Sequence, residues 1–255
     1  MAQFSNNFGS GKGITKGLWR FDGNSRDFSG NGNNGTDSNV TYPWVNGRRV
    51  ASFNGSNSLI TIPNSSSLTI PGNLTVSAWL NVSNFSPDTA GKQGFCIYKG
   101  VYPNYNYRIS TSTTSATNEF SFAMGIGGTF YELFTAGSYK INTNYLVTGV
   151  YDGVGMKLYV NDSLVASNSH AGVVSTTTDN VYCGQYQPTG TYQYSGTTSN
   201  ARVENRAWSA KEVAAYYAST KNKFGETLYA PVNPFKKISQ GIAAVSNFFY
   251  AFFNQ

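Results

Sequence analysis

Short runs of alternating apolar and polar residues recur along most of the chain, and clusters of Gly, Asn, Pro or Ser separate them. In the run 74–82 the residues on one face are all apolar: Leu74, Val76, Ala78, Leu80 and Val82. Alternation of this kind predicts a strand with one face in a core. The runs expected to be strands are 17–21, 50–53, 59–62, 74–82, 94–99, 119–124, 130–134, 145–151, 156–160, 164–167, 181–184 and 201–205. About a dozen short strands with no helix between them predict an antiparallel sandwich.

Two of the connections between these runs have the composition of hairpin turns. Asp152-Gly153 lies between the runs 145–151 and 156–160, and Asn161-Asp162-Ser163 lies between the next two. Residues of these types accept the positive φ that tight hairpins require. Both pairs of runs are therefore expected to be neighbours in one sheet.

The pattern changes at Ser209, where Ser209-Ala210-Lys211-Glu212 has the form of a capping box. A short helix is expected from there to about Lys221. The two prolines in 230–234 predict an extended linker. The organisation expected is an N-terminal arm (1–16), one domain (17–224), a linker (225–234) and a C-terminal segment (235–255).

The C-terminal segment has the apolar spacing of a helix. Ile238, Ile242, Val245, Phe249 and Phe252 follow one another at intervals of four, three, four and three residues. Apolar residues also occupy the other face, so the segment is expected to require a partner surface. The residues assigned to this assembly role are Phe235, Ile238, Ile242, Val245, Phe248, Phe249, Phe252 and Phe253.

Composition supports the all-β interpretation. Only 12% of the 255 residues are charged, while the chain has 4 Trp, 18 Tyr and 17 Phe. Asn, Ser, Thr and Gly supply the remaining polarity, and these residues favour turns and strand faces over helix surfaces. The net charge of +6 is scattered, with Arg48-Arg49 and Lys236-Lys237 as the largest basic clusters. Nucleic-acid binding is not expected, because it requires basic residues gathered on one surface.

The first residues show neither the charged region nor the apolar region of a signal peptide. No run is as long and apolar as a membrane span. The composition nevertheless resembles that of surface-exposed β proteins. A virion protein is made in the host cytoplasm and released on lysis, so it would combine a surface-type composition with the lack of an export signal.

Five stretches, in order, resemble the LamG-like jelly rolls of the concanavalin A-like lectin/glucanase superfamily. They are 18–22 with the Asp-x-Ser-Gly-Asn-Gly loop 27–35, 51–56 with 59–63, 75–80, the hairpins in 150–167, and 202–213. The resemblance covers about Gly17 to Val213. It implies an antiparallel two-sheet jelly-roll sandwich, with a short helix after the last strand, and a recognition or assembly module without catalytic activity.

The resemblance also raises calcium as a candidate cofactor. Asp22 and Asp27 flank a loop rich in Asn and Gly, and carboxylates and carbonyls are the ligands that Ca²⁺ prefers. The family often carries Asp-Glu just before its closing strand, but this chain has Ser199 and Asn200 there. The alternative is that both aspartates cap turns through their own backbone.

Catalytic arrangements are not expected. Glycoside hydrolysis requires two carboxylates that flank the same bond. Neither Glu119 nor Glu132 has an acidic residue two or four positions further along its strand. His170 lies in a polar stretch typical of an exposed loop. Cys96 and Cys183 lie within apolar strands and are expected to be buried thiols. The alternative is a disulfide between them, if their strands are adjacent.

Two loops combine tyrosines with amide side chains. Their tyrosines are Tyr102, Tyr105 and Tyr107 in the first, and Tyr186, Tyr192 and Tyr194 in the second. Aromatic rings among Asn and Gln suit either a glycan or a protein interface, where tyrosine is enriched. The sequence therefore favours a non-enzymatic virion protein, displayed on a bacteriophage particle and bound to other virion proteins or to copies of itself. The alternative is a secreted or cell-surface, extracellular lectin-like module that binds glycans through these loops, with or without calcium. A host-surface glycan is a further candidate partner.

Overall fold

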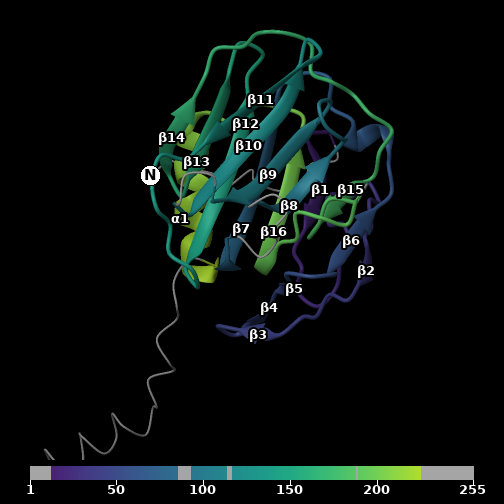
Figure 1. The fold of residues 1–255 in the computed structure, drawn as a ribbon, viewed down its shortest axis with the longest axis vertical. Helices are drawn as coiled ribbons and strands as arrows, with labels where there is room; N and C mark the ends of the chain where they lie inside the picture. The colour runs from purple at the N-terminus through teal and green to yellow at the C-terminus, as the bar shows by residue number, and fades with distance from the viewer. Residues whose placement is uncertain (1–12, 86–92, 114–116, 188, 225–255) are drawn as a thin grey trace, which may run out of the picture. The chain divides into compact units, whose positions relative to one another are not determined.

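The computed structural model describes residues 13–85, 93–113, 117–187 and 189–224, and these form two antiparallel sheets packed face to face (Figure 1). In sheet A the strands are ordered β1, β16, β7, β12, β13, β14, and β5 also pairs with β16. Their bounds are Thr15–Trp19 (β1), Ser195–Glu204 (β16), Leu74–Asn84 (β7), Asn144–Tyr151 (β12), Met156–Val160 (β13), Ser163–Ser167 (β14) and Ala51–Asn54 (β5). The two-sheet sandwich predicted from the alternation is confirmed.

Sheet B has the order β11, β10, β9, β8, β15, β6, β2. The bounds are Thr129–Phe134 (β11), Glu119–Ile126 (β10), Tyr107–Ser112 (β9), Gln93–Lys99 (β8), Val181–Cys183 (β15), Leu59–Ile62 (β6) and Thr36–Ser38 (β2). Two strands, β3 (Trp44–Val45) and β4 (Arg48–Arg49), form a separate hairpin, and a 3₁₀ turn, η1, spans Ser66–Leu68.

The core lies between the inner faces of the two sheets. In β7 the predicted inward residues, Leu74, Val76, Ala78, Leu80 and Val82, are all at most 1% exposed and belong to this core. The hairpin turns also form as expected. The Asp152 carboxylate accepts hydrogen bonds from the backbone N–H of Val154 (3.2 Å) and Gly155 (3.0 Å) between β12 and β13. Asn161, between β13 and β14, has a φ of 60°.

Several strands differ from the sequence-based expectation. The strand β9 was not predicted, because its residues after Tyr107 are mostly Ser and Thr rather than apolar. It lies in the middle of sheet B, where the Ser110 and Ser121 hydroxyls bond each other at 2.6 Å. The strand β1 begins at Thr15, inside the predicted N-terminal arm. A polar strand such as β9 is defined by its pairing with neighbouring strands, and the local sequence pattern does not reveal this pairing.

Helix α1 (Ala210–Phe224) follows the last strand, and the predicted capping box holds its start. The Ser209 N–H donates to Glu212 Oε2 (2.8 Å), and the Glu212 N–H donates to Ser209 Oγ (3.3 Å). The helix covers the outer face of sheet A through a second apolar cluster, formed by Trp79, Leu146, Val150, Tyr159, Trp208, Val213 and Tyr216. It continues one turn beyond the predicted end at Lys221. The predicted linker and C-terminal segment lie outside the described residues.

Candidate ligand-binding sites

The two tyrosine loops meet on the outer face of sheet B, where they form a cluster that we call the aromatic face. Its members are Phe95, Tyr98, Tyr102, Tyr105, Phe130, Tyr182, Tyr186 and Tyr192. Phe95 lies at the centre, with its ring centroid 5.1 Å from that of Tyr192 in a stacked arrangement and 5.4 Å from that of Tyr186. The structure therefore brings together tyrosines that are about 90 residues apart in the sequence.

A bulge in β8 provides the central rings of the aromatic face. The register of β8 against β9 shifts between Phe95 and Ile97. As a result Cys96 and Ile97 both belong to the inner core, while Phe95 and Tyr98 both belong to the outer cluster. The Tyr98 hydroxyl accepts a hydrogen bond from the Gln187 N–H (2.7 Å), which fixes the second loop. Burial raises the pKa of Tyr98 well above its usual value, so this hydroxyl stays neutral.

A buried ion pair lies beneath these rings. Arg108, on β9, pairs with Glu132, on β11, and their side chains are 4% and 10% exposed. The Arg108 guanidinium carbon lies 4.6 Å from the ring centroid of Phe95 and 4.9 Å from that of Tyr105. These distances are those of cation–π contacts. The paired Arg108 therefore restricts the positions of the Phe95 and Tyr105 rings.

Three of the six predicted binding tyrosines are buried, and two of these lie in the core between the sheets. Tyr107 and Tyr194 are fully buried in the core between the sheets. Tyr107 is the first residue of β9 and points inward, and the Tyr194 hydroxyl donates to the carbonyl of Thr197 (2.9 Å). Their assignment as ligand-binding residues was wrong, because both were placed in loops that are in fact continuous with strands.

Of the remaining four tyrosines, three keep part of the ring accessible. Tyr105 is only 2% exposed, whereas Tyr102 is 67% exposed and Tyr186 and Tyr192 are half-buried. The Tyr102 ring lies edge-on to Phe130, with centroids 5.2 Å apart. A ligand on this face would therefore meet Tyr102, Tyr186 and Tyr192 over a base of buried rings.

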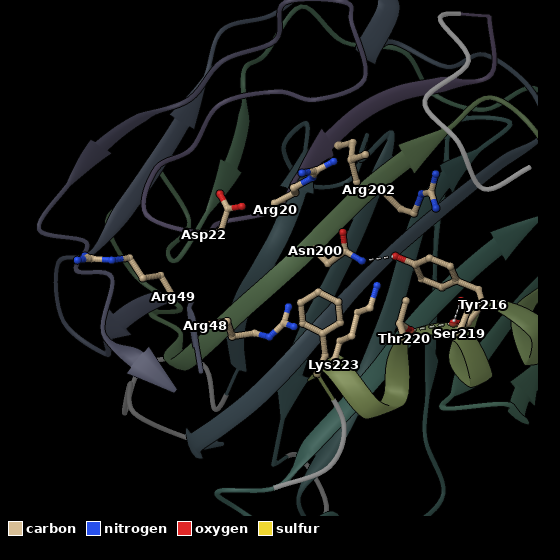
Figure 2. A pocket seen from close by; sticks show the side chains of 12 residues that line it. Arg20, Asp22, Arg48, Arg49, Asn200, Arg202, Tyr216, Ser219, Thr220 and Lys223 are labelled. Carbon is tan, nitrogen blue, oxygen red and sulfur yellow. Dashed lines mark hydrogen bonds between the residues drawn. The ribbon is translucent and has the colours of Figure 1, made fainter. Parts of the chain in front are cut away.

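A polar cavity of about 630 Å³ opens on the other side of the sandwich, between β1, β4, β16 and the end of α1. We call it the basic pocket, because five cations line it and one carboxylate, Asp22 (Figure 2). Its charged and polar lining residues are Arg20, Asp22, Arg48, Arg49, Asn200, Arg202, Tyr216, Ser219, Thr220 and Lys223. Sequence reasoning missed this site, because its cations are spread from residue 20 to residue 223 and only Arg48-Arg49 are adjacent.

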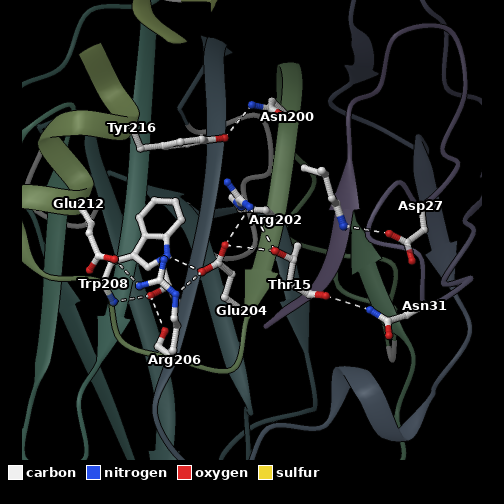
Figure 3. A network of polar contacts seen from close by, with 12 residues as sticks. Thr15, Asp27, Asn31, Asn200, Arg202, Glu204, Arg206, Trp208, Glu212 and Tyr216 are labelled. Carbon is white, nitrogen blue, oxygen red and sulfur yellow. Dashed lines mark hydrogen bonds and ion pairs between the residues drawn. The ribbon is translucent and has the colours of Figure 1, made fainter. Parts of the chain in front are cut away.

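Arg202 connects the basic pocket to a network of buried polar groups (Figure 3). Its Nη2 lies 2.8 Å from Glu204 Oε1, and both side chains are 2% exposed. Glu204 also accepts from Thr15 Oγ1 (3.4 Å), from Arg206 Nε (3.1 Å) and from the Trp208 indole. Glu204 thus receives four donors, which is the full capacity of a carboxylate.

The calcium prediction does not fit the observed donors. Both oxygens of Asp27 accept hydrogen bonds: Oδ1 from the N–H of Leu18 (3.0 Å) and Ser29 (2.8 Å), and Oδ2 from Ser29 Oγ (2.7 Å) and the Asn33 N–H (2.9 Å). Asp22 instead lines the basic pocket. The Asp27 carboxylate therefore has no lone pair left for a cation, and it holds the loop by the turn-capping alternative. Among the described residues, no group of three or more His, Cys, Asp or Glu could hold a metal ion.

The histidine and several of the glutamates that could act in catalysis have structural partners. The His170 ring stacks on Tyr131 with centroids 3.8 Å apart, and Glu132, Glu204 and Glu212 each pair with arginine. Cys96 and Cys183 are buried and unbridged, and burial raises the pKa of both thiols. Within the described ranges, no helix is long and apolar enough to cross a membrane.

The sequence of residues 54–214 matches the family model described as the concanavalin A-like lectin/glucanases superfamily. The chain belongs to this family, and it has the fold of concanavalin A-like carbohydrate- and receptor-binding domains. No curated protein was found to match it in sequence.

Similar solved structures include two binding domains and one domain of an extracellular arabinanase. The binding domain of Paraclostridial Mosquitocidal Protein 1 superposes with a TM-score of 0.65 at 16% identity, covering 82% of this chain and 53% of that one. The binding domain of botulinum neurotoxin serotype G gives 0.64 at 16% identity, with 81% and 51% covered. This chain thus spans about half the length of those two domains. Domain 4 of AbnA, a GH43 extracellular arabinanase from Geobacillus stearothermophilus solved in complex with arabinotriose, gives 0.60 at 18% identity, with 79% and 97% covered.

Proposed function

We propose that this protein is a non-enzymatic recognition module that binds a neutral glycan on the aromatic face. The observation that carries the proposal is the convergence of Tyr102, Tyr186 and Tyr192 over buried rings. Aromatic faces pack against the apolar faces of sugar rings, and rings fixed before binding lose little conformational entropy. The exposed Asn104 amide beside Tyr102 supplies hydrogen bonds for hydroxyl groups. The arabinanase domain with a similar fold was solved with a bound oligosaccharide, which supports the glycan over a protein partner.

A screen of the full chain against an array of neutral and acidic glycans tests this proposal. Tyr102→Ala and Tyr192→Ala should each lower the affinity for a bound neutral glycan about tenfold, which corresponds to about 1.4 kcal/mol. Leu164→Ala, which removes an exposed apolar side chain from β14, should change it less than twofold. Chelation of calcium should have no effect, since the Asp27 oxygens are occupied. Absence of glycan binding, or equal losses in Leu164→Ala, would refute the role of the aromatic face.

A second candidate role is the display of this domain on a bacteriophage particle, with 235–255 docking it to other virion proteins or to further copies. The apolar spacing of that segment favours it, because residues at intervals of four and three form one apolar stripe on a helix. A chain ended at Gly225, the limit of the first compact unit, should stay folded and lose assembly. Undiminished assembly of that shortened chain would contradict the docking role. The two roles are compatible, since they assign different residues of the chain: the aromatic face to residues between 95 and 192, and docking to 235–255.

A further inference from the structure

We propose that the basic pocket is a second ligand site, separate from the aromatic face, and that it takes an acidic saccharide bearing sulfate or phosphate esters. Four elements or loops far apart in sequence place five cations around this cavity. Arg20 follows β1, Arg48 and Arg49 form β4, Arg202 is in β16, and Lys223 is at the end of α1. In Figure 2 the side chains of Arg48 and Lys223 extend toward the space below Asn200.

The pocket's positive charge is only partly neutralised by the protein. Arg202 has Glu204 as a counter-ion, and Asp22 is the one carboxylate in the lining. Within the described residues the other four cations form no ion pair, and like charges brought together repel. The Nε atoms of Arg48 and Arg202 are buried without a hydrogen-bond acceptor in this part of the chain. An anion in the cavity would relieve both the repulsion and the incomplete pairing.

Aromatic rings lie within cation–π distance of four of these cations. The guanidinium carbon of Arg48 lies 4.1 Å above the Phe224 ring, and that of Arg202 lies 5.1 Å from the Tyr216 centroid. Arg20 lies 4.4 Å from Phe28 in the same way, and Arg49 5.4 Å from Trp44. A stacked guanidinium keeps its N–H donors at the edge of its plane, where they can bind two oxygens of one oxyanion. The arginines are thus ordered before any ligand arrives.

A bulge in β16 adds a neutral hydrogen-bonding group to the lining. The register of β16 against β7 shifts between Ser199 and Arg202, and Asn200 has a φ of 50°. This conformation directs the Asn200 amide toward α1, where it donates to the Tyr216 hydroxyl (2.7 Å). β-Bulges commonly re-aim side chains at binding sites. The Asn200 carbonyl oxygen can accept a bond from a ligand hydroxyl.

The size and lining of the pocket favour a saccharide over other anions. A cavity of about 630 Å³ is large for an inorganic ion and lies within the range of sites for small organic ligands. Of the two rings that line it, Tyr216 is 3% exposed, and Phe224 contacts the Arg48 guanidinium and also stacks with Trp79 (centroids 6.0 Å apart), so neither offers a free face to a nucleobase. The hydroxyls of Ser219 and Thr220 and the amide of Asn200 suit a ligand rich in hydroxyl groups.

Isothermal titration of the full chain with a sulfated disaccharide, the same disaccharide without sulfate, a hexose phosphate and inorganic sulfate tests this inference. The two ester-bearing sugars should bind saturably, with an affinity that falls as salt rises. The sugar without sulfate and inorganic sulfate should each bind at least about tenfold more weakly. Equal binding of inorganic sulfate would overturn the saccharide assignment, and no saturable binding of either ester would overturn the site.

Charge-matched variants assign the binding to the pocket. Arg49→Gln and Lys223→Gln change exposed side chains and should each weaken binding of the sulfated disaccharide about tenfold. Arg26→Gln and Lys211→Gln remove the same charge from exposed positions outside the pocket and should change it less than twofold. Equal losses in all four would show attraction by net charge alone and refute the site. Tyr102→Ala should leave this binding unchanged, so failure here is distinguishable from failure of the aromatic face.

Discussion

The outer faces of the two sheets each bury an arginine–glutamate pair against aromatic rings, but under different covers. On sheet A, Tyr216 of helix α1 and Trp208 just before the helix cover Arg202 and Glu204, and both side chains are 2% exposed. On sheet B, loops cover Arg108 and Glu132, and Glu132 is 10% exposed. A helix satisfies its own backbone hydrogen bonds and can close over a continuous surface, whereas loops need water for part of their backbone. The type of segment that covers an ion pair therefore affects how much of it is exposed to water.

The same difference separates the two candidate sites. On sheet A the basic pocket lies at the C-terminal end of the helix. On sheet B the loops leave ring faces and edges accessible across the aromatic face, and Tyr102 is 67% exposed. A fixed cavity with ordered cations suits a charged group, and a broad aromatic surface suits a neutral sugar ring.

The largest effect is expected for Glu204→Gln, which leaves Arg202 buried without its counter-ion. Removing one partner of a buried ion pair costs about 3–5 kcal/mol. Urea unfolding of the variant and the parent protein would measure the loss. A loss below about 1 kcal/mol would show that water reaches Arg202 beneath the helix, against the dry environment inferred here.

The next largest effect is expected for Tyr105→Ala in the aromatic face. Tyr105 is 2% exposed and packs against Phe95, Tyr98 and Phe130. Loss of a buried aromatic ring costs roughly 3 kcal/mol. Tyr102→Ala, at an exposed position of the same loop, should stay within about 0.5 kcal/mol of the parent. Thermal and urea unfolding of both variants would separate the buried base of this face from its surface.

Glu132→Gln should cost less than Glu204→Gln, about 1–3 kcal/mol, because a loop-covered site can admit water to the remaining Arg108. This variant is the direct test of the comparison between the two covers. The measurement is the same urea unfolding at neutral pH. A cost equal to or above that of Glu204→Gln would show that loops seal this face as well as a helix does.

The smallest effect among the glutamate variants is expected for Glu212→Gln at the start of α1, whose side chain is 37% exposed. Burial raises the pKa of Glu212, but hydrogen bonds from Ser209 and Arg206 lower it by more, and the net pKa lies below its usual value of 4.5. The carboxylate therefore stabilises the fold above about pH 4.5, and this contribution is lost as the pH falls through the lowered pKa. We expect a loss of about 0.5–1 kcal/mol near pH 7. Unfolding measured from pH 7 to about pH 3 should show the variant and parent converging, and a constant difference would contradict the role of the charge.

Local patterns predicted the elements whose stabilising contacts are close in sequence. The capping box at Ser209, the Asp152 turn and the inward face of β7 were all recoverable, because each depends on residues within a few positions of one another. The strand β9 was missed because its Ser and Thr residues become strand residues only through pairing with β8 and β10. Tyr107 and Tyr194 were misplaced for the same reason.

The features of the candidate sites also divide into those that the sequence predicted and those that depend on the fold. The sequence by itself determined the sandwich, its family and a supply of tyrosines in two loops, since alternation and turn residues are local properties. Only the tertiary structure decided which tyrosines remain at the surface, and only it gathered Arg20, Arg48, Arg49, Arg202 and Lys223 around one cavity. The scattered positive charge of the sequence becomes a concentrated one because antiparallel pairing brings the first and last strands, β1 and β16, side by side.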